Sequence, residues 1–427
     1  MIDAASRHRS AADATLADLF AQRRSDGAAD LRARAWEAFS REGLPNRRVE
    51  SWRYTDLRAA LLDVKPPRPR GGSYVELADD RLRIALTASE FAAHPAALAA
   101  APDGVTISSL REELAMRNPR VLAALAPACD DPVVALNAAL MQDGAVAQIA
   151  PGAKIDRPIE ICVLPLSEES SFTRSLVLLG AGAQATIVES YGVGALGAQG
   201  NHALVFDIGA GAKLDHVMNA ASASADSVRV ISLLTTLGAG ASLNSFCLIR
   251  GGGLLRRQIF ARLEGEGNEA VFSGATLLRG DDHADTSLTI EHAAPGGKSR
   301  ERFRTIVDGR ATGVFQGKVV VRPGARKTDG AMQSKALLLS PSATMNNKPE
   351  LEIYADDVAC GHGATTGRLD SDLLFYLESR GIPPMEAEAL LIEGFAGEAF
   401  ESVADEALRD ELSRGVSAWL ALRTLER

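Results

Sequence analysis

The sequence predicts a mainly β protein: a parallel β-helix, or solenoid, between two helical domains. Two observations support this prediction. A glycine-rich turn motif recurs at a nearly constant interval through the middle of the chain, and the composition changes on either side of that region. We expect a mainly helical N-terminal domain over residues 1–130, a parallel β-helix core over residues 131–365 and a helical C-terminal domain over residues 366–427.

The first domain is expected to be helical because apolar residues recur at helical spacing and turn residues follow them. Leu31, Ala35 and Phe39 would share one face of a helix that Gly43 ends. Ser109, three residues before a glutamate, has the spacing of a capping box ahead of another short helix. The sequence therefore predicts at least two capped helices before residue 130.

An aromatic and basic block, PNRRVESWRYTDL, lies between these helical patterns. Its arginines (Arg47, Arg48, Arg53), together with Trp52 and Tyr54, would suit a surface on which nucleic-acid bases stack. The whole chain has 46 basic and 55 acidic residues, a formal charge of −9, which argues against that partner. We therefore expect Trp52 and Tyr54 to anchor packing and the arginines to form ion pairs.

The middle of the chain alternates short runs of Val, Ile, Leu and Thr with turns such as LGAGAQ, IGAGAK and VRPGAR. Glycines in these turns recur at intervals of 30, 29, 29, 27, 29 and 28 residues: Gly152, Gly182, Gly211, Gly240, Gly267, Gly296 and Gly324. A solenoid explains this period because each repeat buries its apolar face only against the next one. Glycine also permits the positive φ of a repeated bend. A β-sandwich is the alternative, but its turns keep no single long period. The number of coils in each repeat stays open.

Helical patterns return after residue 366. The segment SDLLFYLESRG has a capping residue at its start and Gly381 at its end, and the next segment begins with prolines, which the first turn of a helix tolerates. Near the end of the chain, apolar residues beside Trp419 repeat at four-residue steps: Leu408, Leu412, Val416 and Leu420. We expect this amphipathic helix to pack against its own domain rather than a partner.

The composition argues against several classes of protein. The acidic charge balance disfavours nucleic-acid partners and anionic membrane surfaces. No run approaches the roughly 20 apolar residues of a membrane helix, and the charged first segment does not resemble a secretory signal, so we expect a cytoplasmic protein. Four scattered cysteines, Cys129, Cys162, Cys247 and Cys360, suit neither a disulfide framework nor a closed zinc site.

Sequence motifs for nucleotide hydrolysis and nucleophilic catalysis are missing. The segment GVFQGK, residues 313–318, has one residue too few between its glycines for a P-loop and no Ser or Thr after the lysine. There is no GxSxG motif, and the histidines are scattered. The acidic run DDHAD, residues 281–285, would suit a carbohydrate-active solenoid, but a solvated turn is the simpler interpretation. The residues alone therefore offer no convincing site for nucleotide hydrolysis or nucleophilic catalysis.

The segment DDVACGHGATTG, residues 356–367, is the strongest candidate for chemistry. A thiolate and an imidazole are common ligands of iron and zinc. Two residues apart on an extended strand, Cys360 and His362 would lie on the same face. Two ligands are too few for a closed site of four. The alternatives are a half-buried cysteine beside a hydrogen-bonded histidine, and a metal site that a second subunit completes.

The segment MNNKPELEIYADDVACGHGATTGRLDSDLLFYLESRGI resembles the signature of the SufB/SufD family, scaffold proteins of the SUF system for iron-sulfur cluster assembly. The resemblance continues in order through PNRRVESWRYTDL, LNAALMQDGAVAQIAPGAKIDRPIEI, RTIVDGRATGVFQGKVVV and AMQSKALLLS. Within the family, the run CGHGAT is similar to the SufD form. The SufB form carries a glutamate-histidine-glutamate run at this place. The resemblance implies a right-handed parallel β-helix between helical domains, as expected from the residues.

The resemblance also implies a function and partners. The chain would be a non-catalytic scaffold subunit that forms a heterodimer with SufB through the β-helices and binds the SufC ATPase through its C-terminal helices. A transient iron-sulfur cluster would be shared with the partner subunit, and none would be held permanently by this chain. A homodimer of the isolated chain stays open. The alternatives are a SufB-like primary scaffold and a carbohydrate-active β-helix enzyme.

The family likeness assigns roles to individual residues unevenly. His362 matches the family position linked to cluster assembly, and Cys360 matches a neighbouring family cysteine. The other three cysteines match no family ligand and are expected to be core thiols. Asp356 and Asp357 are expected to order the loop rather than to bind metal.

Overall fold

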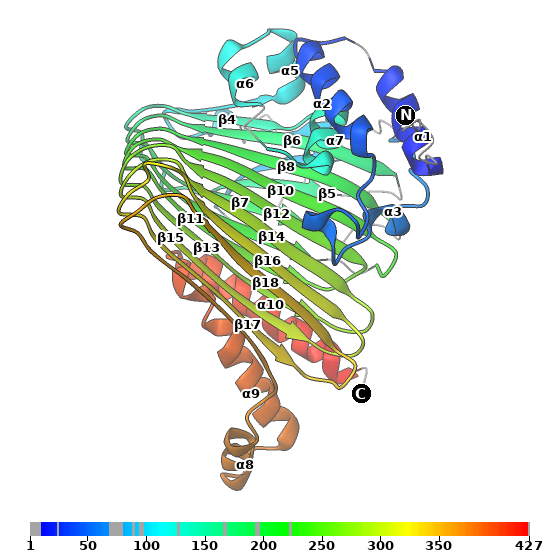
Figure 1. Ribbon diagram of the computed structural model, residues 1–427, viewed down its shortest axis with the longest axis vertical. Helices are drawn as coiled ribbons and strands as arrows, with labels where there is room; N and C mark the ends of the chain where they lie inside the picture. Colours follow the sequence, from blue (N-terminus) through cyan, green and yellow to red (C-terminus); the bar gives the residue numbers. More distant parts are fainter. Residues whose placement is uncertain are drawn as a thin grey trace.

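The computed structural model describes residues 10–23, 25–67, 80–87, 90–93, 98–125, 129–164, 169–192, 197–221 and 224–425. Strands account for 42% of the chain and helices for 26%, which confirms the mainly β class. The strands wind into a β-solenoid of about seven turns, and helices from the two ends of the chain flank it (Figure 1). The first nine residues, from which we expect no secretory signal, lie outside the described part.

Two sheets form the solenoid, and successive strands from β4 onward alternate between them. The first sheet has ten strands, in spatial order β19 (Ala359–Gly367), β17 (Asp329–Leu338), β15 (Lys298–Val307), β13 (Glu269–Leu278), β11 (Ser242–Arg250), β9 (Lys213–Ala221), β7 (Gln184–Tyr191), β5 (Ile159–Leu164), β1 (Leu82–Thr87) and β2 (Glu90–Ala92). The second has nine, in the order β18 (Thr344–Ile353), β16 (Thr312–Val321), β14 (His283–His292), β12 (Leu254–Leu263), β10 (Val228–Leu237), β8 (Gln199–Ile208), β6 (Ser170–Leu179), β4 (Ala145–Ile149) and β3 (Val105–Ser109).

Each repeat of the sequence is one coil made of two strands, one in each sheet. Lys213 of β9 pairs in parallel with Ser242 of β11, 29 residues further along the chain. All seven glycines of the predicted turns have positive φ, between 62° and 88°. The glycine period therefore marks one corner of each coil, as predicted. Each repeat of about 29 residues forms one coil.

The inner faces of the two sheets form one continuous core. Ile187 and Phe272 on the ten-stranded sheet and Leu288 on the nine-stranded sheet are typical members, all buried. Alternate residues of each strand point into this space, as the pleat of a strand requires. The outer face of each sheet needs a separate cover.

The N-terminal helices cover the outer face of the nine-stranded sheet (Figure 1). They are α1 (Ala11–Ala21), α2 (Ala29–Glu42), η1 (Glu50–Trp52), α3 (Leu57–Ala60), α5 (Leu110–Ala115), α6 (Pro119–Ala124) and α7 (Pro132–Leu140). As predicted, α2 ends at Gly43, which has a φ of 68°. The predicted cap of α5 also forms, because the Ser109 side chain accepts a hydrogen bond from the Glu112 amide.

The segment before residue 130 is less helical than we expected. Strands β1, β2 and β3 lie within it and form the first edge of the two sheets. Their short apolar runs, LRIALT and VTISS, are too brief for periodicity to distinguish a strand from a buried helix.

The aromatic block fixes the N-terminal segment to the nine-stranded sheet. Trp52 is buried, its indole Nε1 donates to Asp131 at 3.1 Å, and the Arg256 guanidinium lies 3.9 Å from the centre of its ring. Trp52 is therefore the packing anchor that we expected, whereas Tyr54 is only half-buried. The ion pairs predicted for the block's own arginines are not among those formed in the described part of the chain.

The acidic run at residues 281–285 is only partly a solvated turn. Asp281 is exposed and pairs with Arg310 at 2.5 Å. Asp285 lies within β14, is completely buried, and bonds to Arg256 and to the Thr55 hydroxyl. The solvated-turn interpretation is thus wrong for Asp285, because the strand begins inside the run and turns this carboxylate toward the N-terminal block.

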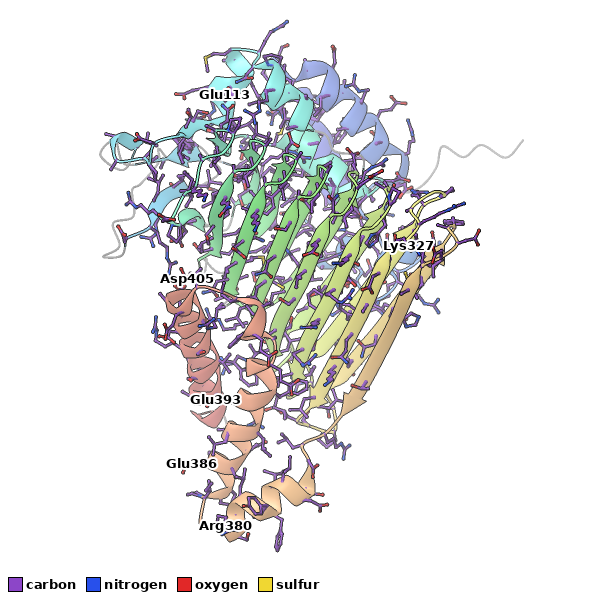
Figure 2. All side chains as sticks on the ribbon, turned by 90° about the vertical axis from the view of Figure 1, so that its left-hand side faces the viewer. Glu113, Lys327, Arg380, Glu386, Glu393 and Asp405 are labelled. Carbon is purple, nitrogen blue, oxygen red and sulfur yellow. The ribbon has the colours of Figure 1, made fainter. Side chains whose placement is uncertain are left out.

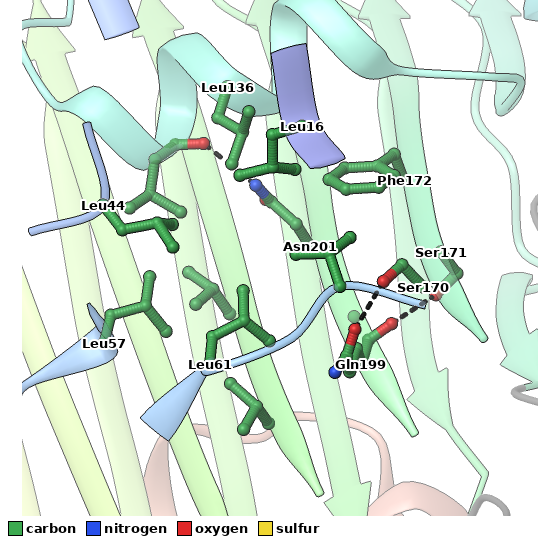
Figure 3. Close-up of a pocket in the computed structure, with 15 residues that line it drawn as sticks. Leu16, Leu44, Leu57, Leu61, Leu136, Ser170, Ser171, Phe172, Gln199 and Asn201 are labelled. Carbon is green, nitrogen blue, oxygen red and sulfur yellow. Dashed lines mark hydrogen bonds between the residues drawn. The ribbon is translucent and has the colours of Figure 1, made fainter. Parts of the chain in front are cut away.

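A small apolar pocket lies between the N-terminal segment and the nine-stranded sheet (Figure 3). Its volume is about 30 Å³, and Leu16, Leu57 and Phe172 are among its walls. The amide of Asn201 crosses it and donates to the Val133 carbonyl at 3.0 Å. A space of this size holds little more than a water molecule, so we regard it as a packing defect rather than a binding site.

The C-terminal helices, except the first of them, cover the outer face of the ten-stranded sheet. They are α8 (Ser371–Ser379), α9 (Pro384–Gly397), η2 (Phe400–Ser402) and α10 (Glu406–Leu425). The stripe predicted on the last helix is buried within this chain, but against outer residues of the sheet such as Val217 and Leu248 as well as against its own helical domain. Figure 2 shows α8 projecting beyond the sheets, near the labelled Arg380. None of the described helices is long and apolar enough to cross a membrane.

Candidate metal site at the open end of the solenoid

The last coil of the solenoid has no successor. Strand β18 ends the nine-stranded sheet and β19 ends the ten-stranded sheet, so each has a neighbour on one side only. No residue of β18 or β19 is buried, whereas every residue of β6 is buried. The outer edges of these strands therefore present backbone donors and acceptors that no strand of the described chain pairs.

Cys360 and His362 both lie on β19, on the face that points between the sheets. Their Cα partners on β17 are Gly330 and Met332, and Met332 is a buried member of the core. The predicted same-face arrangement thus agrees with the strand register. Cys360 is half-buried and packs against the core, while His362 is exposed because no further coil covers it.

The surroundings of Cys360 keep its thiol protonated. Burial raises its pKa, and the nearby carboxyl groups of Asp329 and Glu301 raise it further, although a backbone hydrogen bond from Gly330 opposes them. A thiolate at this position would form readily only when a cation compensates its charge.

A groove of about 740 Å³ lies beside the same strands. His362 and the arginine row of β15, Arg300 and Arg304 among them, contribute to its walls. Arg300 pairs with Asp329 at 2.5 Å and Arg304 with Glu398 of α9 at 2.7 Å. The first pair joins β15 to β17, and the second joins β15 to the end of α9; Glu398 also lines the groove, which therefore has walls from the strands and from the C-terminal segment.

The loop before β19 is held by its second aspartate. Asp357 has a φ of 58°, its carboxylate lies 2.7 Å from the Lys327 ammonium group, and its carbonyl accepts from the Lys327 amide at 2.8 Å. These contacts agree with the expected loop-ordering role of Asp357. They place the start of β19 beside the start of β17.

The other cysteines are buried or half-buried. Cys162 and Cys247 are buried and Cys129 is half-buried. Burial raises the pKa of each thiol, in the case of Cys247 to about 11. Protonated buried thiols behave as small apolar groups, in agreement with the expected role as core thiols.

Sequence reasoning missed one residue near this end of the solenoid, Glu301 of β15. It is completely buried, and its carboxyl group forms no hydrogen bond of good geometry within the described residues, although the Ser299 hydroxyl lies near enough to oppose the rise of its pKa. The available signal was the alternation in SRERF, which places an acidic residue between the inward positions of Ser299 and Phe303.

No three His, Cys, Asp or Glu side chains gather closely enough in the described part of the chain to form a complete metal site.

These observations define a class of protein: a two-sheet β-solenoid with helical covers and one unfinished end that presents a cysteine and a histidine. Comparison with known families agrees with this description. The profile of the SufBD core domain, "SUF system FeS cluster assembly", matches residues 163–395, and that of the SufBD N-terminal region matches residues 81–161. The chain belongs to the SufBD family of the SUF system for iron-sulfur cluster assembly.

Individual relatives cover part of the chain. A SufBD family protein of Synechocystis sp. is 32% identical over 294 residues, which span 66% of this chain and 65% of that protein. The iron-sulfur cluster assembly protein SufD of Escherichia coli is 39% identical over 180 residues, 42% of each chain. SufD of Bacillus subtilis is 26% identical over 293 residues, covering 66% of this chain and 65% of its own length. The matched regions thus span less than two thirds of these relatives.

Proposed function

We propose that this chain is the SufD-type subunit of a SUF scaffold complex. It would be a non-catalytic cytoplasmic protein that pairs with SufB through the open end of its solenoid and supplies His362 and Cys360 to a shared assembly site. The single observation that supports this most strongly is the place of both residues, Cys360 half-buried and His362 exposed, on an edge strand that is paired on one side only within the described chain. Iron and sulfide would be the cargo of this site, and no cluster would remain on the isolated chain.

The open edge favours a partner that also ends in strands. An unpaired edge is a template for pairing with another chain, and two edges are available here, β18 and β19. The interior of the last coil also needs a cover, because Met345, Leu351 and Val358 pack against the core yet are only half-buried. A second solenoid end would satisfy both needs. SufB is the partner we propose, and a second copy of this chain is the competing one.

The projecting helix α8 is the surface that we propose for SufC. Leu373, Phe375 and Tyr376 on α8 and Met385 at the start of α9 are exposed apolar residues, with Phe375 73% exposed. A contiguous exposed apolar patch usually marks an interaction surface. Truncation after Gly381 would be a poor test, because it would also remove α9 and α10 and uncover the outer face of the ten-stranded sheet. A substitution on α8 is preferable.

The likeness to a named SufD favours the SufD role over that of a SufB-like primary scaffold. The family assignment gives no support to a carbohydrate-active enzyme. The chemistry that we assign to this chain is limited to the side chains of Cys360 and His362. Cys360 offers a thiol that becomes a thiolate when cation binds, and His362 offers an imidazole nitrogen at the surface.

Co-expression with SufB and SufC of the same genome, followed by anaerobic purification and absorption spectroscopy, tests the proposal. We expect a stable complex that carries the absorption of an iron-sulfur cluster. His362→Ala should leave the complex intact and lower the cluster content by at least about 10-fold. Thr365→Ala, an exposed change on the opposite face of β19, is the matched control and should have no effect.

Three results would contradict parts of this proposal. Failure to form a complex with either protein would refute the SufD assignment. A purified homodimer that excludes SufB would favour the competing partner. Cluster formation by this chain with SufC alone, without SufB, would favour the SufB-like primary scaffold.

A further inference from the structure

The groove beside β19 contains one arginine without a partner. Arg300, Arg302 and Arg304 alternate along β15 and line this groove, whose volume is about 740 Å³. Asp329 pairs with the first of them and Glu398 with the third. Arg302 is exposed and forms no ion pair or hydrogen bond with any described residue. The groove therefore presents a cation that no carboxylate in the described part of the chain pairs.

The strand register places Arg302 on the outer face of the ten-stranded sheet, two strands from the open edge. Arg302 pairs with Gln333 of β17, and Gln333 pairs with Gly363 of β19. Four residues further along, Ile306 and Leu337 are packed under the C-terminal helices, which fixes this face as the outer one. A row of three residues therefore leads from Arg302 to the edge of the sheet, and its last member has no side chain.

The outer face of β19 leaves the way from the groove to the edge open. Gly361 lines the groove, and Gly363 follows it on the same face. Neither glycine has a positive φ, and a Cβ atom built on either would meet no atom within 4 Å. By contrast, a Cβ atom on Gly317 would lie 2.3 Å from the Met332 sulfur. Neither backbone conformation nor packing in the described chain therefore requires the two glycines of β19, and a glycine in a strand often marks the close approach of another molecule.

We propose that an acidic segment of the partner subunit lies across Gly361 and Gly363, and that one of its carboxylates pairs with Arg302. This inference rests on the proposed function, because the partner strand beside β19 supplies the segment. Three strand spacings, roughly 14 Å, would separate that strand from β15. Two extended side chains can meet over this distance only where the positions of β19 between them are bare. The walls of the groove would partly exclude water from the pair, which strengthens a contact between an arginine and a carboxylate.

The charges around the groove favour a carboxylate as the ligand of Arg302. Glu398 is shared between Arg304 at 2.7 Å and Lys335 at 3.7 Å, so its charge is already balanced. Glu401 also lines the groove but forms no ion pair with Arg302. A basic or apolar segment would remove the guanidinium of Arg302 from water without replacing its hydrogen bonds, which costs free energy. An acidic segment would replace them.

A second copy of this chain does not offer the acid that Arg302 lacks. A two-fold dimer through the open end would pair β19 either with itself or with β18 of the other copy. Strand β19, with the sequence ACGHGATTG, contains no acid. On β18, Glu352 already pairs with Lys318 at 2.8 Å. Glu350 lies 3.5 Å from the Lys348 ammonium group. The free carboxylate is therefore expected from a different chain.

The affinity of the full chain for SufB of the same genome, measured at low and at high salt, tests the inference. Arg302→Glu should weaken binding by about 10-fold or more, because it sets two carboxylates against each other. Arg302→Gln should make binding less sensitive to salt, because the ion pair is lost. Lys213→Glu makes the same change of charge at an exposed position of β9 on the same face of the sheet. It is the matched control and should bind SufB as the unmodified chain does.

A glycine variant separates binding from folding. Gly363→Val should keep or raise the melting temperature of the isolated chain, because valine suits an extended strand and would meet no atom there. It should nevertheless weaken SufB binding by about 10-fold or more, because the new side chain occupies the place of the partner segment. Gly394→Ala, at an exposed position of α9 with equally open surroundings, is the control. It should stabilise the chain and leave SufB binding unchanged.

The outcomes separate this inference from the proposed function. If Arg302→Glu and Gly363→Val bind SufB normally while His362→Ala lowers the cluster content of the complex, the groove is not a contact and the proposed function survives. If the unmodified chain does not bind SufB, both are overturned. If the two variants change only the self-association of the chain, a second copy is the occupant. If inorganic phosphate stabilises the unmodified chain but not Arg302→Gln, and SufB binding is the same for both, the groove holds a small anion. Either of these last results would overturn the acidic segment.

Discussion

The two ends of the solenoid are finished in opposite ways. At the first end, β1 and β4 each pair with an antiparallel strand, β2 and β3, and the helix α5 follows β3 directly. At the last end, no strand of the described residues pairs beyond β18 or β19, and none of the residues in these two strands is buried. The first end resembles the capped terminus that a stable solenoid needs. The last end has no such cap, and its final coil leaves a surface on which a further repeat could stack. Cys360 and His362, the residues to which we assign metal chemistry in our proposal, lie at the uncapped end.

The largest expected difference between the ends is in packing energy. Leu82 of β1 is completely buried, whereas Leu351 of β18 packs against the same core but is half-buried. Leu82→Ala should lower the free energy of unfolding by about 3 kcal/mol, and Leu351→Ala by about 1 kcal/mol. Urea unfolding of the isolated chain measures both. Equal losses would mean that the last coil is as well packed as the first.

Much of this comparison could be predicted from the sequence. The solenoid could be predicted from the glycine period, because a corner that requires positive φ recurs at residues such as Gly211 and Gly240. The two-residue spacing of Cys360 and His362 correctly predicted that both side chains lie on the same face of the strand. The open end could not be predicted, since the sequence of β18 and β19 does not tell whether a further strand follows them in space. The same holds for Glu301, because an acid on a strand usually points to solvent, and only the register places it inside.

The second expected difference concerns the charge inside the open end. Glu301 has a pKa of about 8 in the folded chain, because of burial, against 4.5 in its ordinary state. Between these values the unfolded chain has lost the proton that the folded chain keeps, so this group lowers stability as the pH rises. On the inner face burial raises the pKa of Cys360 and lowers that of His292 to about 4, so both stay neutral, while on the outer face Arg300 and Asp329 are charged and pair with each other.

Glu301→Gln should therefore stabilise the chain by roughly 2 kcal/mol at neutral pH, with a gain that grows from about pH 5 to about pH 8. Denaturant unfolding at these two pH values measures the gain. A pH-independent difference would show that Glu301 is ionised and paired when folded.

The third expected difference is in partner binding, between two exposed apolar side chains at the two ends of the chain. Phe375 on α8 is 73% exposed and Leu62 near the N-terminal helices is 72% exposed. We expect Phe375→Glu to weaken SufC binding by about 10-fold or more, as for a central aromatic contact, and Leu62→Glu to leave it unchanged. Neither change should alter the melting temperature appreciably, since both side chains face water. Loss of SufC binding in both variants, or in neither, would place the SufC surface elsewhere.

The smallest effect is expected in the loop that leads to β19. Asp357 combines an exposed ion pair to Lys327 with a φ of 58°, which asparagine tolerates and alanine does not. Asp357→Asn should cost less than about 0.5 kcal/mol because exposed ion pairs contribute little, and Asp357→Ala should cost about 1 kcal/mol more because of the backbone. Thermal unfolding of the two variants separates charge from conformation. If the asparagine variant lost as much stability as the alanine variant, the ion pair rather than the turn would hold the open end in place.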